Sequence, residues 1–257
     1  MIGRFSFELE RTQPVSLLRA RGVLDAYTAA DLRGAMVECL TEQPAGVLID
    51  VSDLALADDV ALTVLASTAQ ESLRWPGTRF ALGGANRHFA ASVDRLGVSR
   101  YVTVCPDRAS ALLELGRWPV PPSRRRRLTP DQFAPGLARD AVRDFCDEWR
   151  VRDGDAAQLV ASELVTNAVL HARTAIDLTL RFVPPYLQIS VRDGGPGEVR
   201  LAENVDEFSH NGRGLLLVDA LATAWGSLFP SAGKIVWATV RVRSIPQGSE
   251  RTNGPPE

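Results

Sequence analysis

The sequence contains no long apolar segment, and its N-terminal residues 1–13 carry charges where a signal peptide would be continuously apolar. Its longest apolar runs fall well below the roughly 20 residues that a helix needs to cross a bilayer. These two absences argue against a membrane-spanning protein and against a secretory leader of the usual kind. We therefore expect a cytoplasmic protein that makes no membrane contact.

Cysteine and net charge are also scarce. Cys39, Cys105 and Cys146 lie far apart and form no C-x-x-C pair, which argues against a disulfide framework and against a zinc site and predicts buried free thiols. A formal net charge of -2 argues against a protein whose main partners are nucleic-acid phosphates or acidic membranes. We expect no direct binding of nucleic acid.

The chain is long enough, and contains enough hydrophobic residues, to form two hydrophobic cores. Its 257 residues exceed the roughly 150 of a typical domain, and 45% of them are hydrophobic. The clearest break is segment 118–130, where four prolines and the run Arg124–Arg127 forbid a continuing helix or an interior strand. We predict a domain over 1–117, a linker over 118–130, a second domain over 131–245 and a disordered tail over 246–257. For the arginine run, a solvated linker and a nucleic-acid patch both stay open.

Hydrophobic periodicity predicts the elements of both halves. In the first half strands alternate with helices, which indicates an α/β sheet with helices packed on it; the predicted strands are 15–24, 46–51, 79–82 and 102–104, and the predicted helices are 29–39, 59–75, 89–96 and 108–115. The second half reads as a mixed α+β layer; its predicted helices are 135–149, 155–171 and 214–222, and its predicted strands are 175–182, 186–192 and 234–242.

The predicted helix 155–171 carries polar residues at a four-residue spacing. Glu163, Asn167 and His171 therefore share one helix face, opposite an apolar face. A carboxylate and a carboxamide one turn apart can hold a hydrated divalent cation through oxygen, and the carboxylate can also orient a hydroxyl. The alternative is the ordinary solvent side of an amphipathic helix.

Two glycine-rich segments follow. In Asp193-Gly194-Gly195-Pro196-Gly197 an acid leaves a predicted strand, so that it can accept a hydrogen bond from an exocyclic amine while the glycines let backbone amides approach a ligand. The alternative is a hairpin turn. In segment 211–214, which reads Asn-Gly-Arg-Gly, the glycines precede an apolar helix, whose free amides and dipole favour an anion such as phosphate. This segment is also compatible with a plain helix start.

Four motifs occur in the second half in the order E-x-x-x-N, D-G-G-P-G, G-R-G and a closing G-K-x-V-W strand. In this order they resemble the ATP-binding motifs of the GHKL superfamily. The sequence over roughly 129–242 is similar to that of anti-sigma factor serine kinases. The resemblance implies a two-layer α/β sandwich that binds ATP and Mg²⁺. The threonine that many relatives carry after the last glycine is replaced here by Lys234-Ile235. The resemblance implies that Glu163 is the general base, Asn167 the magnesium ligand and Asp193 the residue that binds the adenine amine. It also implies a nucleotide clamp, two loops that enclose the nucleotide and contain Gly195, Gly197, Gly212, Arg213 and Gly214.

The first half, about residues 5–116, resembles the STAS domains of anti-anti-sigma factors, with G-x-L-D at 22–25 and the strand 47–51 in the expected order. Such domains usually present a phosphoacceptor serine at a helix N-terminus. Here the corresponding positions are Asp58 and Asp59. Helix capping and partial mimicry of a phosphoserine both stay open, and in either case the usual serine switch is absent.

These resemblances imply a bacterial partner-switching regulator of sigma-factor-dependent transcription, in which a STAS module is fused to an ATP-dependent protein-serine kinase of the anti-sigma type. The implied partners are a sigma factor and a separate STAS protein, and a homodimer stays open. The alternative is a non-catalytic module in which ATP orders the loop around residues 204–213 and so alters partner choice.

Overall fold

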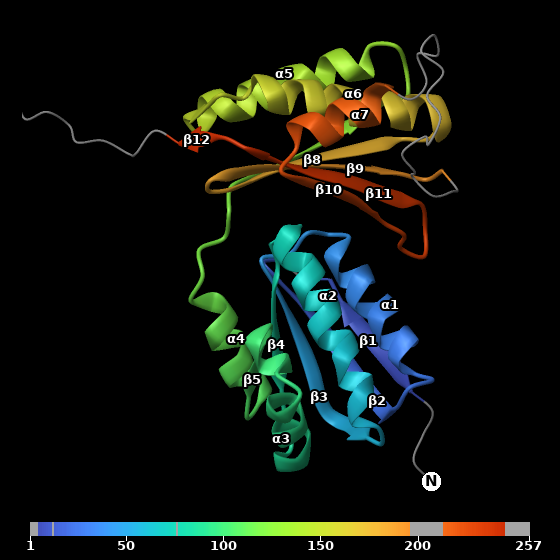
Figure 1. Ribbon diagram of the computed structural model, residues 1–257, viewed down its shortest axis with the longest axis vertical. Coiled ribbons are helices and arrows are strands. Elements are labelled where there is room, and N and C mark those ends of the chain that lie inside the picture. Colours follow the sequence, from blue (N-terminus) through green and yellow to red (C-terminus); the bar gives the residue numbers. More distant parts are fainter. Residues whose placement is uncertain (1–4, 12, 76, 196–212, 245–257) are drawn as a thin grey trace, which may run out of the picture.

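The computed structural model describes residues 5–11, 13–75, 77–195 and 213–244, which form two α/β domains in contact with each other (Figure 1). This confirms the predicted fold class. Within the part of the chain that the structure describes, every helix is too short or too polar to cross a membrane.

The first domain is built on a five-stranded sheet with the order β1–β2–β3–β4–β5. β2 to β5 are parallel, and β1 is an antiparallel edge strand that the sequence pattern did not indicate. The strands are β1 (Ser6–Glu10), β2 (Val15–Leu24), β3 (Gly46–Leu56), β4 (Arg79–Gly83) and β5 (Val102–Cys105). The central strand β3 is almost wholly buried over its first six residues, as expected of a parallel strand covered on both faces.

Helices cover both faces of this sheet. α1 (Ala29–Leu40), α2 (Thr63–Arg74) and α3 (Arg87–Arg95) share one core with it, and α4 (Arg108–Gly116) packs on the other face. The short 3-10 helices η1 (Asp59–Leu62) and η2 (Val98–Arg100) complete the domain. The carboxamide of Asn86 and the carboxylate of Asp107 cap α3 and α4 by accepting backbone N–H groups at 2.9 Å and 2.7 Å.

The second domain is a two-layer sandwich with an antiparallel sheet in the order β10–β11–β9–β8–β6. One face of the sheet is covered by three helices, which form its apolar core. A two-stranded sheet joins β7 (Val151–Arg152) to β12 (Arg243–Ser244). The strands are β6 (Ser123–Leu128), β8 (Ile176–Val183), β9 (Tyr186–Asp193), β10 (Ala224–Leu228) and β11 (Lys234–Arg241), and the helices are α5 (Ala134–Glu148), α6 (Asp155–His171) and α7 (Arg213–Leu221).

The arginine run is the clearest departure from the sequence prediction. Residues 118–130 were predicted to be a linker, but Ser123–Leu128 form β6, which pairs with β8 along its whole length. The prediction was wrong for this strand because an edge position lets alternate arginines reach solvent and acidic partners. Arg124 pairs with Glu148 of α5, and Arg125 lies 3.1 Å from Glu42 of the first domain. The predicted tail 246–257 lies outside the described residues.

The first domain covers the sheet face that the helices of the second domain leave free (Figure 1). Trp75, at the end of α2, stacks on Trp237 of β11 with ring centroids 5.7 Å apart and an interplanar angle of 7°. Both indoles are buried, together with Ile235. Unlike the helical side, however, this face of the sheet is largely polar; its buried polar residues include Thr179, Arg181, Gln188, Ser190 and Thr239.

Polar contacts between the domains centre on the loop after α1. The Arg181 guanidinium, 3% exposed, donates to the carbonyl oxygens of Gln43 and Pro44 at 2.9 Å and 3.2 Å. Burial lowers the pKa of Arg181 to about 10, so it stays charged at neutral pH. The Gln43 side chain donates to Ser190 Oγ at 2.6 Å, and Glu42 also lies 3.5 Å from Arg192. The contact between the domains therefore combines one aromatic stack with several hydrogen bonds and with the ion pairs of Glu42.

Candidate functional site

Helix α6 places two of the predicted site residues beside the start of α7. Its apolar face, which includes Val160 and Leu164, is buried against the sheet, whereas Glu163 and Asn167 are half-buried on the other side. A Cβ added to Gly214 would lie 2.6 Å from Glu163 Oε2 and 3.8 Å from Asn167 Oδ1. Any larger residue at position 214 would therefore push on the carboxylate. Within the described residues the Asn167 amide nitrogen is buried and has no hydrogen-bond partner.

Asp193 ends β9 as a buried carboxylate, 3% exposed. Its Oδ1 accepts a hydrogen bond from the Gly195 N–H at 2.8 Å, but its Oδ2 has no hydrogen-bond partner in the described chain. The Lys234 ammonium lies 3.9 Å from Oδ2, a distance suited to an ion pair but too long for a hydrogen bond. Burial raises the pKa of Asp193, against the opposing effects of the Gly195 N–H, Lys234 and His171. The site thus holds a buried acceptor oxygen that lacks a donor.

Two glycines near Asp193 lie too close to neighbouring backbone to carry a side chain. A Cβ on Gly195 would lie 2.8 Å from Ala172 Cα. Gly233 has φ +78°, and a Cβ on it would lie 2.0 Å from the Asp193 carbonyl oxygen. Both positions therefore require glycine. Thr174 Oγ accepts the Gly194 N–H at 2.8 Å. Sequence reasoning missed Thr174, because no motif links a threonine before a strand to a glycine 20 residues later.

The remaining predicted residues of the nucleotide clamp are described only in part. Gly197 and Gly212 lie outside the described residues, and Arg213 begins α7 but its side chain is not among those described. In the described ranges no group of three His, Cys, Asp or Glu side chains could hold a metal ion. Mg²⁺ does not require such a group, because it commonly binds one or two protein oxygens together with phosphates and water.

At the predicted phosphoacceptor position of the first domain, the two acids have different surroundings. Asp58 caps η1, since its Oδ1 accepts the Val60 N–H at 2.9 Å. Asp59 instead pairs with Arg95 of α3. A hydrogen bond from Ser92 and the Arg95 guanidinium hold the pKa of Asp59 below its usual value. Asp59 is therefore an ionised group whose charge is matched within its own domain.

The fold and the site define a two-domain protein. A mostly parallel α/β domain is joined to an α/β sandwich, in which one buried carboxylate oxygen of Asp193 has no hydrogen-bond donor in the described chain. Residues 7–106 match the family model of the STAS domain (Mlab, STAS domain), and residues 127–240 match that of the histidine kinase-like ATPase domain. The chain is thus a STAS domain followed by a histidine kinase-like ATPase domain, a family assignment that implies ATP binding by the second domain.

Solved structures similar to this chain include anti-sigma factor antagonists and a histidine kinase. An anti-sigma factor antagonist from Mycobacterium paratuberculosis is 22% identical, with 44% of this chain and 95% of that chain covered and a TM-score of 0.38. A putative anti-sigma factor antagonist from Thermotoga maritima is 19% identical, with 43% and 95% covered and a TM-score of 0.38. Histidine kinase AdeS from Acinetobacter baumannii is 12% identical, with 70% and 94% covered and a TM-score of 0.29. A comparison with curated proteins finds no match.

Proposed function

We propose that the second domain binds Mg-ATP and phosphorylates a serine of a separate STAS protein, and that the chain acts as a partner-switching regulator of sigma-factor-dependent transcription. The observation that carries this proposal is that the buried Oδ2 of Asp193 has no hydrogen-bond donor in the described chain. A buried acceptor without a donor costs about 1–3 kcal/mol, more when it is charged. A ligand that brings an N–H group to this oxygen recovers that cost, and the exocyclic amine of adenine is such a group.

The phosphate end of the nucleotide is assigned to the start of α7, beside Glu163 and Asn167. Gly214 brings the α7 backbone close to both side chains, since a Cβ at this position would come within 2.6 Å of Glu163 Oε2. The first backbone N–H groups of α7 have no partner within the helix, and they lie at the positive end of its dipole, so both favour phosphate oxygens. In this proposal the nucleotide extends from Asp193 to the start of α7.

Asn167 and Glu163 have different proposed roles, metal binding and proton transfer. The Asn167 amide oxygen is a suitable hard ligand for Mg²⁺, which shares its other ligand positions with phosphates and water. When bound, Mg-ATP supplies a transferable phosphoryl group. Glu163 orients the incoming serine hydroxyl and accepts its proton as the oxygen attacks. The role of Glu163 depends on its charge, whereas nucleotide binding does not.

The first domain is assigned a binding role rather than a substrate role. Asp59 stands where related domains carry the acceptor serine, and a carboxylate forms no stable phosphate ester. Its single negative charge is already paired with Arg95, against roughly -1.5 to -2 for a phosphoserine. The substrate serine is therefore expected on another protein, and a sigma factor is the expected target of binding.

The test is ATP affinity measured calorimetrically on the full chain with and without Mg²⁺. We expect Asp193→Asn and Asn167→Ala each to weaken Mg-ATP binding by about tenfold or more, or about 1.4 kcal/mol. Asp140→Asn is the matched control, because Asp140 is exposed on α5 and pairs only with Arg143 in the described chain. Unchanged affinity in both site variants would refute the proposed nucleotide site.

Glu163→Gln separates a kinase from a non-catalytic nucleotide-gated module. The amide keeps the shape of the carboxylate but removes the base, so phosphate transfer to a serine-bearing STAS protein should stop while ATP affinity stays within about twofold. If the wild-type protein binds ATP and a sigma factor but transfers no phosphate to any such partner, the kinase proposal fails and the non-catalytic module replaces it.

A further inference from the structure

Lys234 is the only lysine of the chain; the rest of its 29 Lys and Arg residues are arginines. It is also buried, with 7% of its surface exposed. It begins β11, where it pairs with Asp193 at the end of β9. Burying an ammonium group is costly unless its charge is compensated. The chain therefore keeps a costly buried charge at one place, beside the carboxylate to which the adenine amine is assigned.

The side chains of Lys234 and Asp193 lie on the helix-covered face of the sheet. Residues directly opposite each other in an antiparallel pair share a face, and so do residues two positions apart along a strand. Val236 and Val191, two positions from Lys234 and Asp193, belong to the apolar core beneath the helices. The ammonium group therefore lies on the side of the sheet where the nucleotide is proposed to bind.

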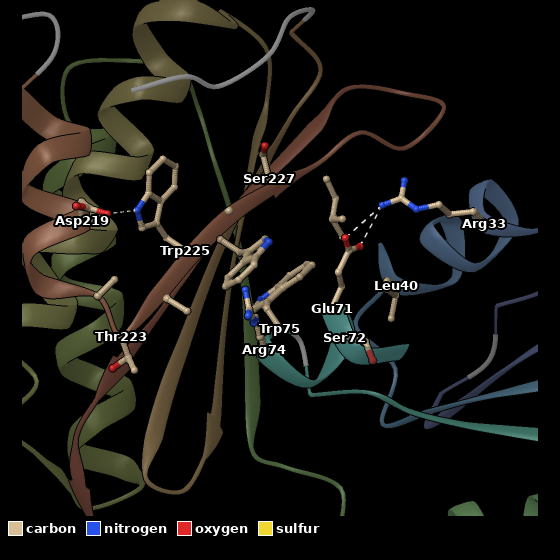
Figure 2. A pocket seen from close by; sticks show the side chains of 15 residues that line it. Arg33, Leu40, Glu71, Ser72, Arg74, Trp75, Asp219, Thr223, Trp225 and Ser227 are labelled. Carbon is tan, nitrogen blue, oxygen red and sulfur yellow. Dashed lines mark hydrogen bonds and ion pairs between the residues drawn. The ribbon is translucent and has the colours of Figure 1, made fainter. Parts of the chain in front are cut away.

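The other face of β11 serves a different contact. Ile235 and Trp237, which alternate with the residues of the helix-covered face, are buried with Trp75 of the STAS domain. Figure 2 shows the groove at this contact, which Trp75 helps to line. Neither Lys234 nor Asp193 lines this groove. Lys234 is therefore not part of the contact between the domains.

Asp193 and Lys234 each leave hydrogen-bonding capacity unused. The Asp193 Oδ2 has no hydrogen-bond donor in the described chain. Among the described residues Lys234 Nζ has one polar partner, the same Oδ2 at 3.9 Å, which is too long for a hydrogen bond. A buried donor and a buried acceptor thus lie side by side on one face of the sheet, and neither has a hydrogen-bond partner in the part of the chain that the structure describes.

Such a pair matches one edge of adenine. The exocyclic N6 amine is a donor, and the ring nitrogen N1 beside it is an acceptor. When N6 donates to Asp193 Oδ2, N1 can accept a hydrogen bond from the Lys234 ammonium. Guanine in the same orientation would bring its O6 acceptor to the carboxylate and its N1–H donor to the ammonium. Both contacts would then be repulsive, so the pair favours adenine over guanine.

An arginine at this position would not leave the carboxylate available. Its guanidinium is a planar fork of donors that pairs with a carboxylate through two parallel hydrogen bonds, and so it would occupy Oδ2 of Asp193. An ammonium is a compact charge, and at 3.9 Å it leaves Oδ2 free to accept from a ligand. This difference gives a reason for lysine at position 234 in a chain that otherwise uses arginine.

From the buried pair, the sheet face that it shares and the use of lysine, we propose that Lys234 is a specificity-determining residue, which donates a hydrogen bond to N1 of adenine while Asp193 accepts one from N6. The inference rests on the proposed function, because it requires ATP in the site. It adds a second residue that recognises the base. A lysine that only balanced the charge of Asp193 would make no distinction between bases with and without N1.

The test compares ATP with 1-deaza-ATP, in which a C–H group replaces N1, by calorimetry on the full chain with Mg²⁺. We expect the wild type to bind ATP about tenfold or more tightly than the analogue, because the analogue loses a hydrogen bond from a charged donor. Lys234→Met should bind the two nucleotides with affinities within about twofold of each other. Arg241→Met is the control and should keep the wild-type preference, because Arg241 is the exposed last residue of the same strand.

The single lysine gives a second readout, which requires no variant. In protein labelled with nitrogen-15 at lysine side chains, Lys234 Nζ gives the only lysine signal in the nuclear magnetic resonance spectrum. ATP should shift this signal more than 1-deaza-ATP does at saturation, because only ATP offers N1 as an acceptor. Equal shifts with both nucleotides would contradict a hydrogen bond to N1.

Two calorimetric results would overturn the proposal. The first is equal affinity of the wild type for ATP and 1-deaza-ATP, and the second is an undiminished preference for ATP in Lys234→Met. Either result leaves the proposed function standing if Asp193→Asn still weakens ATP binding. A wild-type protein that binds no ATP would overturn both proposals, so the two failures are distinguishable.

Discussion

Replacing Asp59 with serine would place a hydroxyl at the predicted phosphoacceptor position of the STAS domain, and the fold determines which chain can phosphorylate it. The STAS domain touches the ATPase domain at the end where β3 begins and α2 ends, with Trp75 on Trp237. Position 59 lies at the opposite end, after β3 and before α2. The proposed ATP site is on the helical side of the second sheet, the side that faces away from the STAS domain. We therefore expect no phosphate transfer to position 59 within one chain.

The separation follows from element lengths. The 11 residues of β3 span roughly 35 Å at about 3.3 Å per residue. The return path through the four residues of η1 and the 12 of α2 spans about 26 Å, at about 2.0 Å and 1.5 Å per residue. Crossing the second sheet to its helix layer adds about 10 Å. A serine at position 59 thus lies roughly 35 Å or more from Glu163, whereas in-line attack requires about 3–3.5 Å.

The assay follows phosphate incorporation into Asp59→Ser with labelled Mg-ATP over a hundredfold range of protein concentration, with wild type as the control. Any phosphate at position 59 should appear at a rate per molecule that rises with concentration, because transfer must occur between chains. A rate per molecule that stays constant on dilution would refute the domain arrangement on which the reasoning rests. A second check is the distance between spin labels at Asp59→Cys and His171→Cys, which should exceed about 35 Å.

Two further outcomes follow from the described contacts. Burial raises the pKa of Asp193, and Lys234 opposes that rise. Mg-ATP affinity should therefore fall as the pH is lowered through this pKa and Asp193 becomes protonated, and Lys234→Met should move the fall to higher pH. Superimposable pH profiles of the two proteins in calorimetry would contradict this. Trp75→Ala removes the indole stacked on Trp237 and should cost about 3–5 kcal/mol, mainly as lost contact between the domains. Calorimetry should then resolve two unfolding transitions. Trp149→Ala is the control and should leave one transition, because Trp149 is an exposed residue that follows α5 and lies away from the contact between the domains.

Hydrophobic periodicity predicted the long elements well, because both halves place apolar residues at regular spacing against a sheet. Helix α6 begins and ends at the predicted residues Asp155 and His171, and β3 starts at Gly46 as expected. β10 escaped prediction because Ala-Trp-Gly-Ser-Leu has no clear alternation, and β6 because an arginine run reads as solvated chain.

For the site, spacing alone placed Glu163 and Asn167 on one face, and the structure brings Gly214 against both. The contact between Arg181 and the loop at Gln43 could not be predicted, because the two lie 138 positions apart and neither belongs to a motif. Contacts of this kind depend on how two finished domains meet, which local sequence patterns do not record.

The polar face under the STAS domain has a consequence for how firmly the two domains associate. Its hydroxyl, amide and guanidinium groups would be well hydrated if exposed, and Arg181 Nε and Gln188 Oε1 lack hydrogen-bond partners in the described contact. Such a polar contact resembles a transient interface between proteins more than the apolar interface of an obligate complex. Cleavage of the chain in the proline-rich segment before β6 should accordingly give two domains that each stay in solution and that associate again when they are mixed.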